Sequence, residues 1–368
     1  MIGKRLYVIM ILIGISVAHL SAQQREETFT IAGTGADGTD KLVLQYDSSG
    51  FPSVFFQDIF TPVCLDNVCK PVRIKLFWDL LGNYIQYEVP LDEPLTKLDH
   101  QEFTPADYEK LQQILANDES LLKQLKMEEL MDSTTQRLSD SVDAVTGATK
   151  NTVKGEVIEG ALYTCYTLWH LVHGQVVDEI HQVMQTKLDE QMLHRFLKST
   201  NFHYVHFALD EVMDKQGMVQ KGFLPDVLAV LESNHIFAAR RVAQEINLRY
   251  FTAGSEQEKL WVIFTRSAYS QQVVLLRRMT GLTLDTRLVE EIANYLPKLN
   301  QALFKQGVSL LAHQENLSPP IQEKLMAYLK STDQQKAQVV YQAMNGKNQL
   351  TDTAKKQLNA YRKQQNQL

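Results

Sequence analysis

The sequence predicts an α+β module followed by an all-α array of helices that runs to the end of the chain. Between residues 23 and 90, short runs alternate apolar and polar residues, the period of half-buried strands. From about residue 175 onward, apolar residues recur at helical spacing and no strand pattern occurs. With 368 residues, 44% hydrophobic and 22% charged, the chain is globular in composition and long enough for two domains.

The strand predictions rest on three segments. Lys41–Tyr46 is a short strand that ends at a turn formed by residues 47–50. Val72–Trp78 alternates apolar and polar residues, so one face of this strand is expected to be buried. Gly82-Asn83 then reverses the chain, and Tyr84–Val89 returns as the second strand of a hairpin.

A helix is predicted to begin after Thr104-Pro105-Ala106-Asp107. Thr104 caps it, Pro105 takes the first helical position, and Asp107 reaches back to a free amide. One apolar face follows, made by Tyr108, Leu111, Ile114 and Leu115. The α+β module is therefore expected to span residues 25–174.

A faint internal repeat marks the helical half, residues 175–368. Phe223–Leu231 resembles Tyr295–Leu303 at an offset of 72, and Lys259–Ser267 lies halfway, at an offset of 36. A period near 36 with two helices per unit is typical of a HEAT-type solenoid, and an irregular helical bundle is the alternative. The last 20 residues are polar and are expected to fray.

The N-terminus has the composition of a secretory signal. Lys4 and Arg5 precede Leu6–Ala18, an apolar run of 13 residues, with Ser16/Ala18 or Ala22 as candidate cleavage positions. A membrane span needs about 20 apolar residues, so residues 1–22 are predicted to be a signal peptide, with a short uncleaved anchor as the alternative. The mature chain is then extracytoplasmic, periplasmic or secreted, with no transmembrane segment.

The cysteines agree with an oxidising compartment. Cys64 and Cys69 lie five residues apart in P-V-C-L-D-N-V-C-K-P and are predicted to form a disulfide. A zinc site would need two further ligands at similar spacing, and the sequence has none. Cys165 lies in an apolar helix and is expected to be a buried small hydrophobe.

One polar segment, residues 139–153, combines hydroxyls and a glycine just before a predicted helix. It contains Asp143-Ala-Val-Thr146-Gly147-Ala148-Thr149. Gly147 permits close approach of a ligand, and Thr146 or Thr149 can cap a helix that is expected to begin near Asn151. The apolar positions of that helix are Val153, Val157, Ala161 and Leu162. A helix start of this kind suits a phosphate, although an ordinary helix cap has the same composition.

The segment resembles the attachment motif of the FMN-binding domain family, which occurs in sodium-pumping quinone reductase and in the related electron-transport complex. That motif reads Asp-x-x-(Ser/Thr)-Gly-Ala-(Ser/Thr), which Asp143, Thr146, Gly147, Ala148 and Thr149 match in full, with Thr152 following. The resemblance implies FMN held by a phosphoester on Thr149, attached outside the cytoplasm by a flavin transferase. It also implies that Asp143, Gly147 and Ala148 serve recognition by that enzyme and close approach.

The function predicted on this basis is an extracytoplasmic flavoprotein that passes electrons between unidentified redox partners, with the helices as a docking scaffold. Such a carrier need not be an enzyme with a substrate of its own. The competing hypothesis is a non-catalytic interaction scaffold in which Thr-Gly-Ala-Thr is only a helix cap.

Other candidate residues lie between 161 and 173. Cys165 and His170 do not point to one spot on a helix, which disfavours a hydrolase. The aromatic residues Tyr163, Tyr166 and Trp169 either flank a flavin ring or belong to the core. His170 and His173 lack a third metal ligand nearby, so a structural role is favoured. The net charge of −6 gives no reason to expect nucleic acid as a partner.

Overall fold

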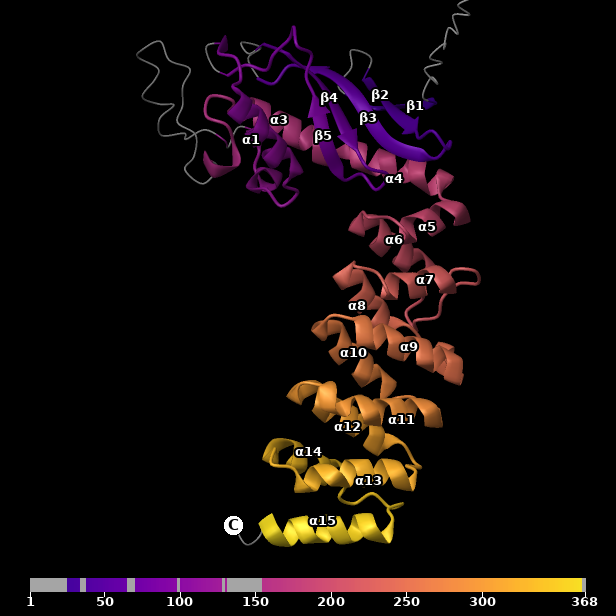
Figure 1. Ribbon diagram of the computed structural model, residues 1–368. Helices are drawn as coiled ribbons and strands as arrows, with labels where there is room; N and C mark the ends of the chain where they lie inside the picture. The colour runs from indigo at the N-terminus through magenta and orange to yellow at the C-terminus, as the bar shows by residue number, and fades with distance from the viewer. Residues whose placement is uncertain are drawn as a thin grey trace, which may run out of the picture. The chain divides into compact units, whose positions relative to one another are not determined.

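A computed structural model describes residues 25–33, 38–64, 70–97, 100–127, 130 and 154–365 (Figure 1). The chain divides into two compact units, Met1–Lys187 and Leu188–Leu368, which are called here the sheet unit and the helical unit. The predicted signal peptide, residues 1–22, lies outside the described residues, as do Cys69 and the whole of the motif from Asp143 to Thr149.

The sheet unit contains a five-stranded antiparallel meander in which each strand pairs with the next along the chain (Figure 1). The predicted strand at Lys41–Tyr46 and the predicted hairpin after Val72 are both present, and their elements are β2, β4 and β5. The bounds are β1 Glu26–Ala32, β2 Thr39–Tyr46, β3 Pro52–Thr61, β4 Val72–Trp78 and β5 Tyr84–Glu88.

The hairpin between β4 and β5 turns as its residues predict. The Asp79 carboxylate accepts hydrogen bonds from the backbone N–H groups of Leu81 (2.8 Å) and Asn83 (2.9 Å). Gly82 has a φ of +80°, a left-handed conformation that glycine adopts at little cost. A side chain at Gly82 would also come within 2.8 Å of Val177, so the turn packs directly against a helix.

One face of the sheet is buried under three helices, α1 Pro105–Ala116, α3 Leu162–His173 and α4 Gln175–Lys187. Leu44, Phe55 and Trp78 are opposite one another on this face and are fully buried, because the register pairs Leu44 with Phe55 and Phe55 with Trp78. The Trp78 indole N–H donates to the carbonyl of Val172 at 2.9 Å, which fixes α3 on the sheet. The apolar strand positions therefore face the core, as the period-2 pattern predicts.

The other face of the sheet is partly open to solvent. Phe56 and Phe77 form a tilted ring pair across β3 and β4, with centroids 5.9 Å apart. Phe60, which is 59% exposed, lies under the guanidinium of Arg73 at 4.9 Å. Cross-strand aromatic pairs and cation–π contacts of this kind stabilise a half-exposed sheet face modestly.

Helix α4 belongs to the sheet unit, so the boundary lies at 187/188 rather than at the predicted 174/175. His181 Nε2 lies 2.8 Å from the carbonyl of Leu81, in the β4–β5 turn. Lys187, at the end of α4, forms an ion pair with Glu27 of β1 at 2.7 Å. These contacts join residues that are at least 100 positions apart in the chain, which no local pattern could reveal.

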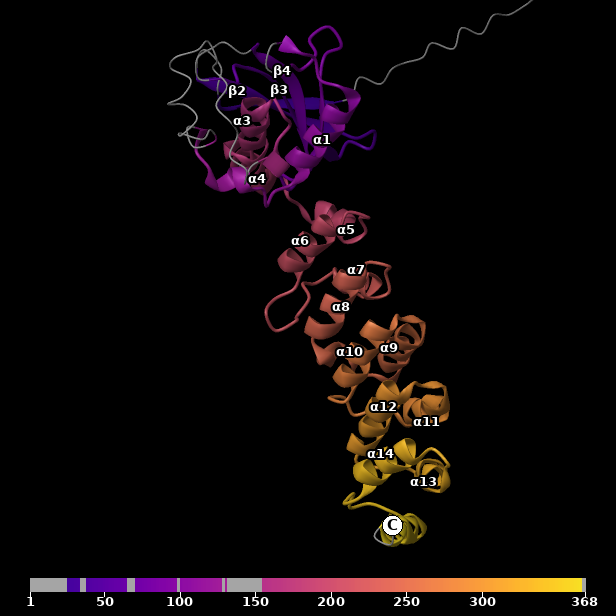
Figure 2. The ribbon, with the colours of Figure 1, turned by 90° about the vertical axis from the view of Figure 1, so that its left-hand side faces the viewer.

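The helical unit consists of helices that pack in pairs, each pair on the next. The even-numbered helices α6 to α14 contact one another in succession, and beside them α5 contacts α7 and the odd-numbered helices α9 to α15 contact one another in succession. Figures 1 and 2 show these two layers. The bounds are α5 Glu190–Leu197, α6 Phe202–Val212, α7 Leu224–Leu231, α8 Ile236–Glu245, α9 Gly254–Arg266, α10 Tyr269–Met279, α11 Thr286–Tyr295, α12 Gln301–His313, α13 Pro319–Ala327, α14 Gln334–Met344 and α15 Asp352–Gln365.

The repeat is shorter than the sequence comparison indicates, and its alignment was wrong. The even-numbered helices begin at residues 202, 236, 269, 301 and 334, so successive starts lie 32 to 34 residues apart. Phe223–Leu231 covers α7 and the residue before it, whereas Tyr295–Leu303 spans the end of α11, a 3₁₀ turn (η6, Leu296–Lys298) and the start of α12. The two segments look alike because each has a proline at the start of a helical turn, Pro225 and Pro297, which is favourable there wherever the turn lies.

Buried glutamines join one helix pair to the next. Gln257, the fourth residue of α9, donates to the carbonyls of Phe251 and Thr283 and accepts from the N–H of Asp285. Gln322, the fourth residue of α13, makes the same three kinds of contact with Leu317, Gln349 and Thr351. These side chains satisfy backbone groups of the loops that precede α11 and α15, which would otherwise be buried without partners.

The C-terminal segment is an ordered helix, and the prediction that it frays was wrong. Ala354, Leu358 and Tyr361 of α15 are buried, and the Tyr361 ring packs on Tyr341 with centroids 5.2 Å apart. A narrow apolar stripe is thus enough to hold α15 on the preceding pair, even though its other faces are polar. Among the described residues, no helix has the length and apolar character that a membrane span requires.

Candidate functional site

The predicted FMN site lies in a segment of which the structure describes only the two flanks. Leu130 precedes it and is fully buried, and a short 3₁₀ turn at Lys154–Glu156 (η4) follows it. Val157 and Ile158 are also buried, so the chain enters and leaves the segment from the core of the sheet unit. The placement of Asp143, Thr146, Gly147, Ala148 and Thr149 is therefore still a prediction from sequence.

The helix predicted to begin near Asn151 is absent from residues 154–161. The next α-helix is α3, which begins at Leu162, thirteen residues after Thr149. Its N-cap residue is Ala161, which makes no side-chain capping bond, and Gly160 before it turns the chain with a φ of +77°. The spacing of Val157 and Ala161 fits a helix, but both side chains are buried as part of a turn that packs on the core. The predicted helix from Asn151 to Leu162 therefore does not form as one element, and residues 150–153, next to Thr149, lie outside the described residues.

The side chains of α3 that were candidate ligands are bonded to backbone carbonyls. Trp169 Nε1 donates to Asn117 at 2.8 Å, while His170 Nε2 lies 3.1 Å from the carbonyl of Leu122 and His173 Nε2 2.9 Å from that of Leu115. The carbonyls of Leu115 and Asn117 lie at the end of α1, where a helix leaves its last C=O groups without intrahelical partners, and that of Leu122 lies in the 3₁₀ turn Leu121–Gln124 that follows. Burial lowers the pKa of both histidines, so they stay neutral near pH 7. The histidines hold α1 and α3 together, as the structural interpretation predicts.

The other α3 candidates also belong to the fold. Cys165 is buried and free, and burial raises the pKa of its thiol to about 11, so it is not a thiolate nucleophile at neutral pH. The Tyr166 hydroxyl donates to the carbonyl of Leu125 at 3.0 Å. Tyr163 has an interaction of its own. No group of histidine, cysteine and carboxylate side chains suited to a metal ion occurs in the part of the chain that the structure describes.

The structure describes only one of the two cysteines of the predicted disulfide. Cys64 follows β3 and has an interaction partner, but Cys69 lies outside the described residues. Non-reducing peptide mapping is the direct measurement of the Cys64–Cys69 bond.

The connections from each odd-numbered helix to the following even-numbered one lie on one side, which we call the connection edge of the helical unit, and three of the five share a local structure. The hydroxyl of Ser199 accepts from the N–H of Asn201 at 3.0 Å, and Ser233 and Ser331 make the same bond to residues His235 (3.2 Å) and Asp333 (3.1 Å). Each serine lies two residues before the N-cap of an even-numbered helix, so the bonds recur with the repeat. The search for an internal repeat in the sequence missed this pattern, although the serines are present in the sequence.

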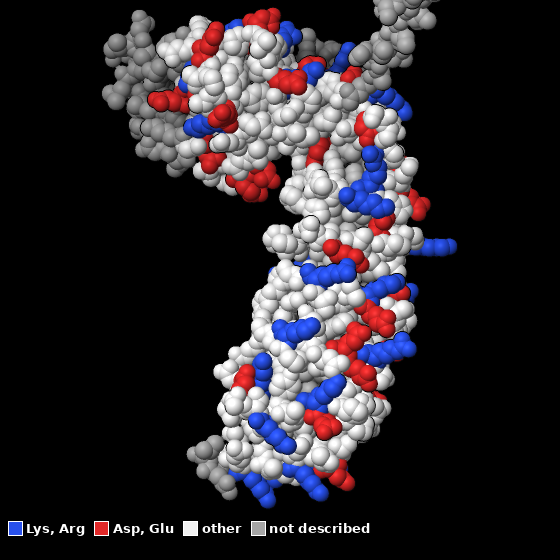
Figure 3. Space-filling model, in the orientation of Figure 1, with Lys and Arg blue, Asp and Glu red and all other residues white. Residues whose placement is uncertain are grey.

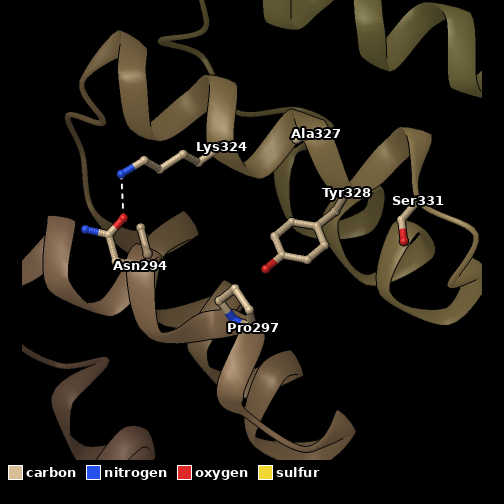
Figure 4. Close-up of a pocket in the computed structure, with 7 residues that line it drawn as sticks. Asn294, Pro297, Lys324, Ala327, Tyr328 and Ser331 are labelled. Carbon is tan, nitrogen blue, oxygen red and sulfur yellow. Dashed lines mark hydrogen bonds between the residues drawn. The ribbon is translucent and has the colours of Figure 1, made fainter.

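A first cavity of about 430 Å³ opens on this connection edge, between α11 and α13 (Figure 4). Asn294, Pro297, Lys324 and Tyr328 line it, and the Lys324 ammonium donates to the Asn294 side chain across its rim. Burial raises the pKa of the Tyr328 hydroxyl, which keeps it protonated and able to donate a hydrogen bond. The cavity is open and small, so it suits one side chain or head group of a partner better than an enclosed substrate.

A second cavity of about 880 Å³ lies at the other end of the even-numbered helices, where α6, α8 and α10 end. Arg241 is one of its lining residues and forms ion pairs with Asp210 and Glu245, the latter at 3.1 Å. Arg278 donates to the carbonyl of Ile246 beside it, at the end of α8. The cavity is lined by both charge signs and lacks a nucleophile with a paired base, so it has the composition of a polar contact surface rather than of an active site.

The two units have net charges of opposite sign. By sequence, residues 1–187 carry 15 Lys/Arg and 26 Asp/Glu, a net charge of −11, and residues 188–368 carry 22 and 17, a net charge of +5. On the face that Figure 3 shows, Lys and Arg recur along the helical unit with Asp and Glu among them. The helical unit therefore favours partners with negative charge.

No known protein shows what these sites do. The FMN resemblance is therefore supported by the residues of the motif alone, and the role of each cavity is inferred from its geometry alone. Comparisons of the chain with protein-family models, curated proteins and solved structures find no match.

Proposed function

We propose that this chain is an extracytoplasmic, non-catalytic scaffold whose helical unit docks a protein partner. The observation that supports this best is the two-layer stacking of successive helix pairs, which presents both ends of five even-numbered helices along one continuous structure. Stacked helix pairs of this kind form α-solenoids, whose long surfaces bind other proteins. The unit length of 32 to 34 residues is nearer to the 34-residue class of two-helix repeats than to HEAT units of about 40–47 residues.

The second cavity is the proposed docking point for a protein partner. Arg241 and its two carboxylates offer donors and acceptors in fixed geometry, and Gln244 and Glu245 beside them are exposed. Charged groups that are already paired and partly exposed contribute specificity more than affinity. A partner is therefore expected to bind with a polar surface of its own.

A photo-cross-linking amino acid at Gln244 tests the scaffold proposal in the native host. We expect it to link the chain to one recurring protein, because Gln244 lies at the rim of the second cavity. The matched control is the same amino acid at Lys356, an exposed position of α15. Identical cross-linked species at both positions would show that the links are random and would contradict the proposal.

We further propose that the scaffold carries FMN, esterified to Thr149, and passes electrons to or from its docked partner. Support comes from the complete match of Asp143, Thr146, Gly147, Ala148 and Thr149 to the attachment motif, and from the signal-like N-terminus. The flavin transferase would move FMN from FAD to the Thr149 hydroxyl oxygen, so the pyrophosphate bond of FAD breaks, AMP leaves and the hydroxyl proton is released. The protein would supply position and electronic environment, and the flavin would supply the redox chemistry.

Intact mass measures this modification directly. After secretion in the presence of a flavin transferase, the wild-type chain should gain the mass of one FMN less one water and should be yellow. Thr149→Ala should lose both the added mass and the colour, whereas the matched control Thr152→Ala should retain them. A wild-type chain of bare polypeptide mass under these conditions would remove the flavin proposal and leave the docking proposal unaffected.

A further inference from the structure

Three successive even-numbered helices begin with large apolar side chains that are open to solvent. They are Phe202 at the start of α6, Ile236 and Phe237 at the start of α8, and Tyr269 at the start of α10. Their exposures are 56%, 55%, 79% and 52% in that order. We call these four residues the aromatic edge. Because exposed apolar residues that recur at one position mark an interaction surface, the aromatic edge calls for a partner.

The residues of the aromatic edge lie along one continuous line. His235 Nε2, next to Ile236, lies 3.0 Å from the carbonyl of Ser199, which precedes α6. Gln271, in the first turn of α10, donates to the carbonyl of Leu231 at the end of α7, 2.8 Å away. Packed helices are roughly 8–10 Å apart, so the line from Phe202 to Tyr269 is about 20 Å long.

The fold does not require aromatic residues at these positions. In α12 and α14, the equivalent first residues are Gln301 and Gln334, both of which are exposed. These two helices pack as the earlier ones do, with a polar side chain at the same position. The aromatic edge is thus a local property of the first three pairs, and it indicates binding rather than stability.

Cations flank the aromatic edge. Lys198 lies at the end of α5 with its side chain 63% exposed, and it pairs with Asp226 through one oxygen at 3.0 Å. Arg240 of α8 and Arg266 at the end of α9 are exposed as well. The acidic residue within the connections themselves is Glu232. Counted together with the Asp226 that pairs with Lys198, these residues are three cations and two carboxylates, so the edge has a small positive bias, like the whole helical unit.

The aromatic side chains protrude and are not part of either cavity. The residues that line the two cavities do not include Phe202, Ile236, Phe237 or Tyr269. A peptide partner usually inserts its own anchor residues into a pocket, whereas here the chain itself supplies the protruding groups. Protruding aromatic residues beside Lys and Arg are the composition of surfaces that enter a lipid interface, where rings lie at head-group depth and cations pair with phosphates.

We propose that the aromatic edge docks the helical unit on an anionic lipid surface. Phe202, Phe237 and Tyr269 insert between the lipid head groups, while Lys198, Arg240 and Arg266 contact the phosphates. The contact is peripheral and reversible, because it combines a few interfacial rings with a few charges. It uses the opposite ends of the even-numbered helices from the second cavity, so lipid and protein partner are able to bind at once.

Vesicle co-sedimentation of the full chain, and of the chain lacking residues 1–22, tests this proposal. Vesicles of phosphatidylcholine mixed with phosphatidylglycerol should bind both, and vesicles of phosphatidylcholine alone should bind the shorter chain much more weakly. The triple variant Phe202→Ser, Phe237→Ser, Tyr269→Ser should lose at least tenfold in partitioning of the shorter chain. The matched control is Phe60→Ser, which removes an equally exposed aromatic residue beside an arginine in the sheet unit and should change nothing.

A charge series gives a second, independent measure. Each of Lys198→Gln, Arg240→Gln and Arg266→Gln should weaken partitioning roughly fivefold, and added salt should erase these differences. Circular dichroism checks that every variant is folded. Equal partitioning of the triple variant and the unsubstituted chain, both lacking residues 1–22, would overturn the proposal. Loss of vesicle binding altogether, with the aromatic edge instead cross-linking to a protein, would also overturn it and assign the edge to a protein interface.

Discussion

Trp78→Ala should lower the free energy of unfolding of the sheet unit by about 3–5 kcal/mol, the range for removal of a large buried aromatic side chain. Trp78 has no solvent exposure and lies on the buried face between Phe55 and β5. Its loss leaves a cavity under α3 and also leaves the Val172 carbonyl without its donor. Because α3 is held on the sheet at this point, backbone amides throughout the sheet unit should lose protection against hydrogen exchange.

The neighbouring residue provides the control. Phe77 is next in β4 but lies on the half-exposed face, so Phe77→Ala should cost only about 1 kcal/mol through its pair with Phe56. Hydrogen–deuterium exchange, read on peptides from residues 70–97 and from 188–365, assigns each loss to its unit, and urea unfolding gives its size. Equal effects of the two substitutions would mean that the assignment of the two sheet faces is incorrect.

Gln257→Ala should destabilise the helical unit by about 2–4 kcal/mol, because it leaves three buried backbone groups without partners at once. The side chain is 1% exposed, and its bonds to Thr283 and Asp285 are 2.9 Å and 2.8 Å long. Those two residues lie in the loop that sets α11 on α9. Urea unfolding should show a lower midpoint, and amide exchange should increase first around residues 281–286.

The repeat supplies both a test of generality and a control. Gln322→Ala removes the equivalent bonds before α15 and should have a similar effect, additive with the first because the two sites share no partners. Gln301→Ala removes an exposed glutamine that pairs with Gln335 and should cost less than about 0.5 kcal/mol. A loss in Gln301→Ala as large as that in Gln257→Ala would contradict the role given to the buried glutamines.

Three of the five strands, β2, β4 and β5, were predicted because they have a local signature, whereas β1 and β3 were not predicted as separate strands. Alternation in residues 72–78 identifies the buried face before any partner strand is known. Asp79 and Gly82 specify the turn through local interactions, because the Asp79 carboxylate bonds to backbone N–H groups of the turn and Gly82 adopts a positive φ. The capping box of Thr104 and Asp107 is present as predicted, for the same reason. Contacts between distant segments, such as Lys187 with Glu27, have no such local record.

The helical unit was predictable in kind but not in period. Helical spacing of apolar residues is a property of each helix, whereas the repeat depends on which helix ends meet. Proline at a helical start is favourable in any context, so matching Pro225 with Pro297 aligned elements that are not equivalent. The recurring serine turns and the buried glutamines carry the true period, and their role becomes visible only when the neighbouring pair is in place.

By itself, the sequence determined the strands β2, β4 and β5, the helix α1 with its cap, the helical class of the second half, the buried face of β4, and the motif that proposes FMN at Thr149. The tertiary structure decided the rest: that α4 belongs to the sheet unit, that α15 is ordered, that His170 and His173 bond to carbonyls of α1 and the turn after it, and that Phe202, Phe237 and Tyr269 form one edge. The physical reason is the range of the interactions. Periodicity and capping act within one or two turns of the chain, whereas burial and hydrogen bonding between elements depend on residues that only the folded chain brings together.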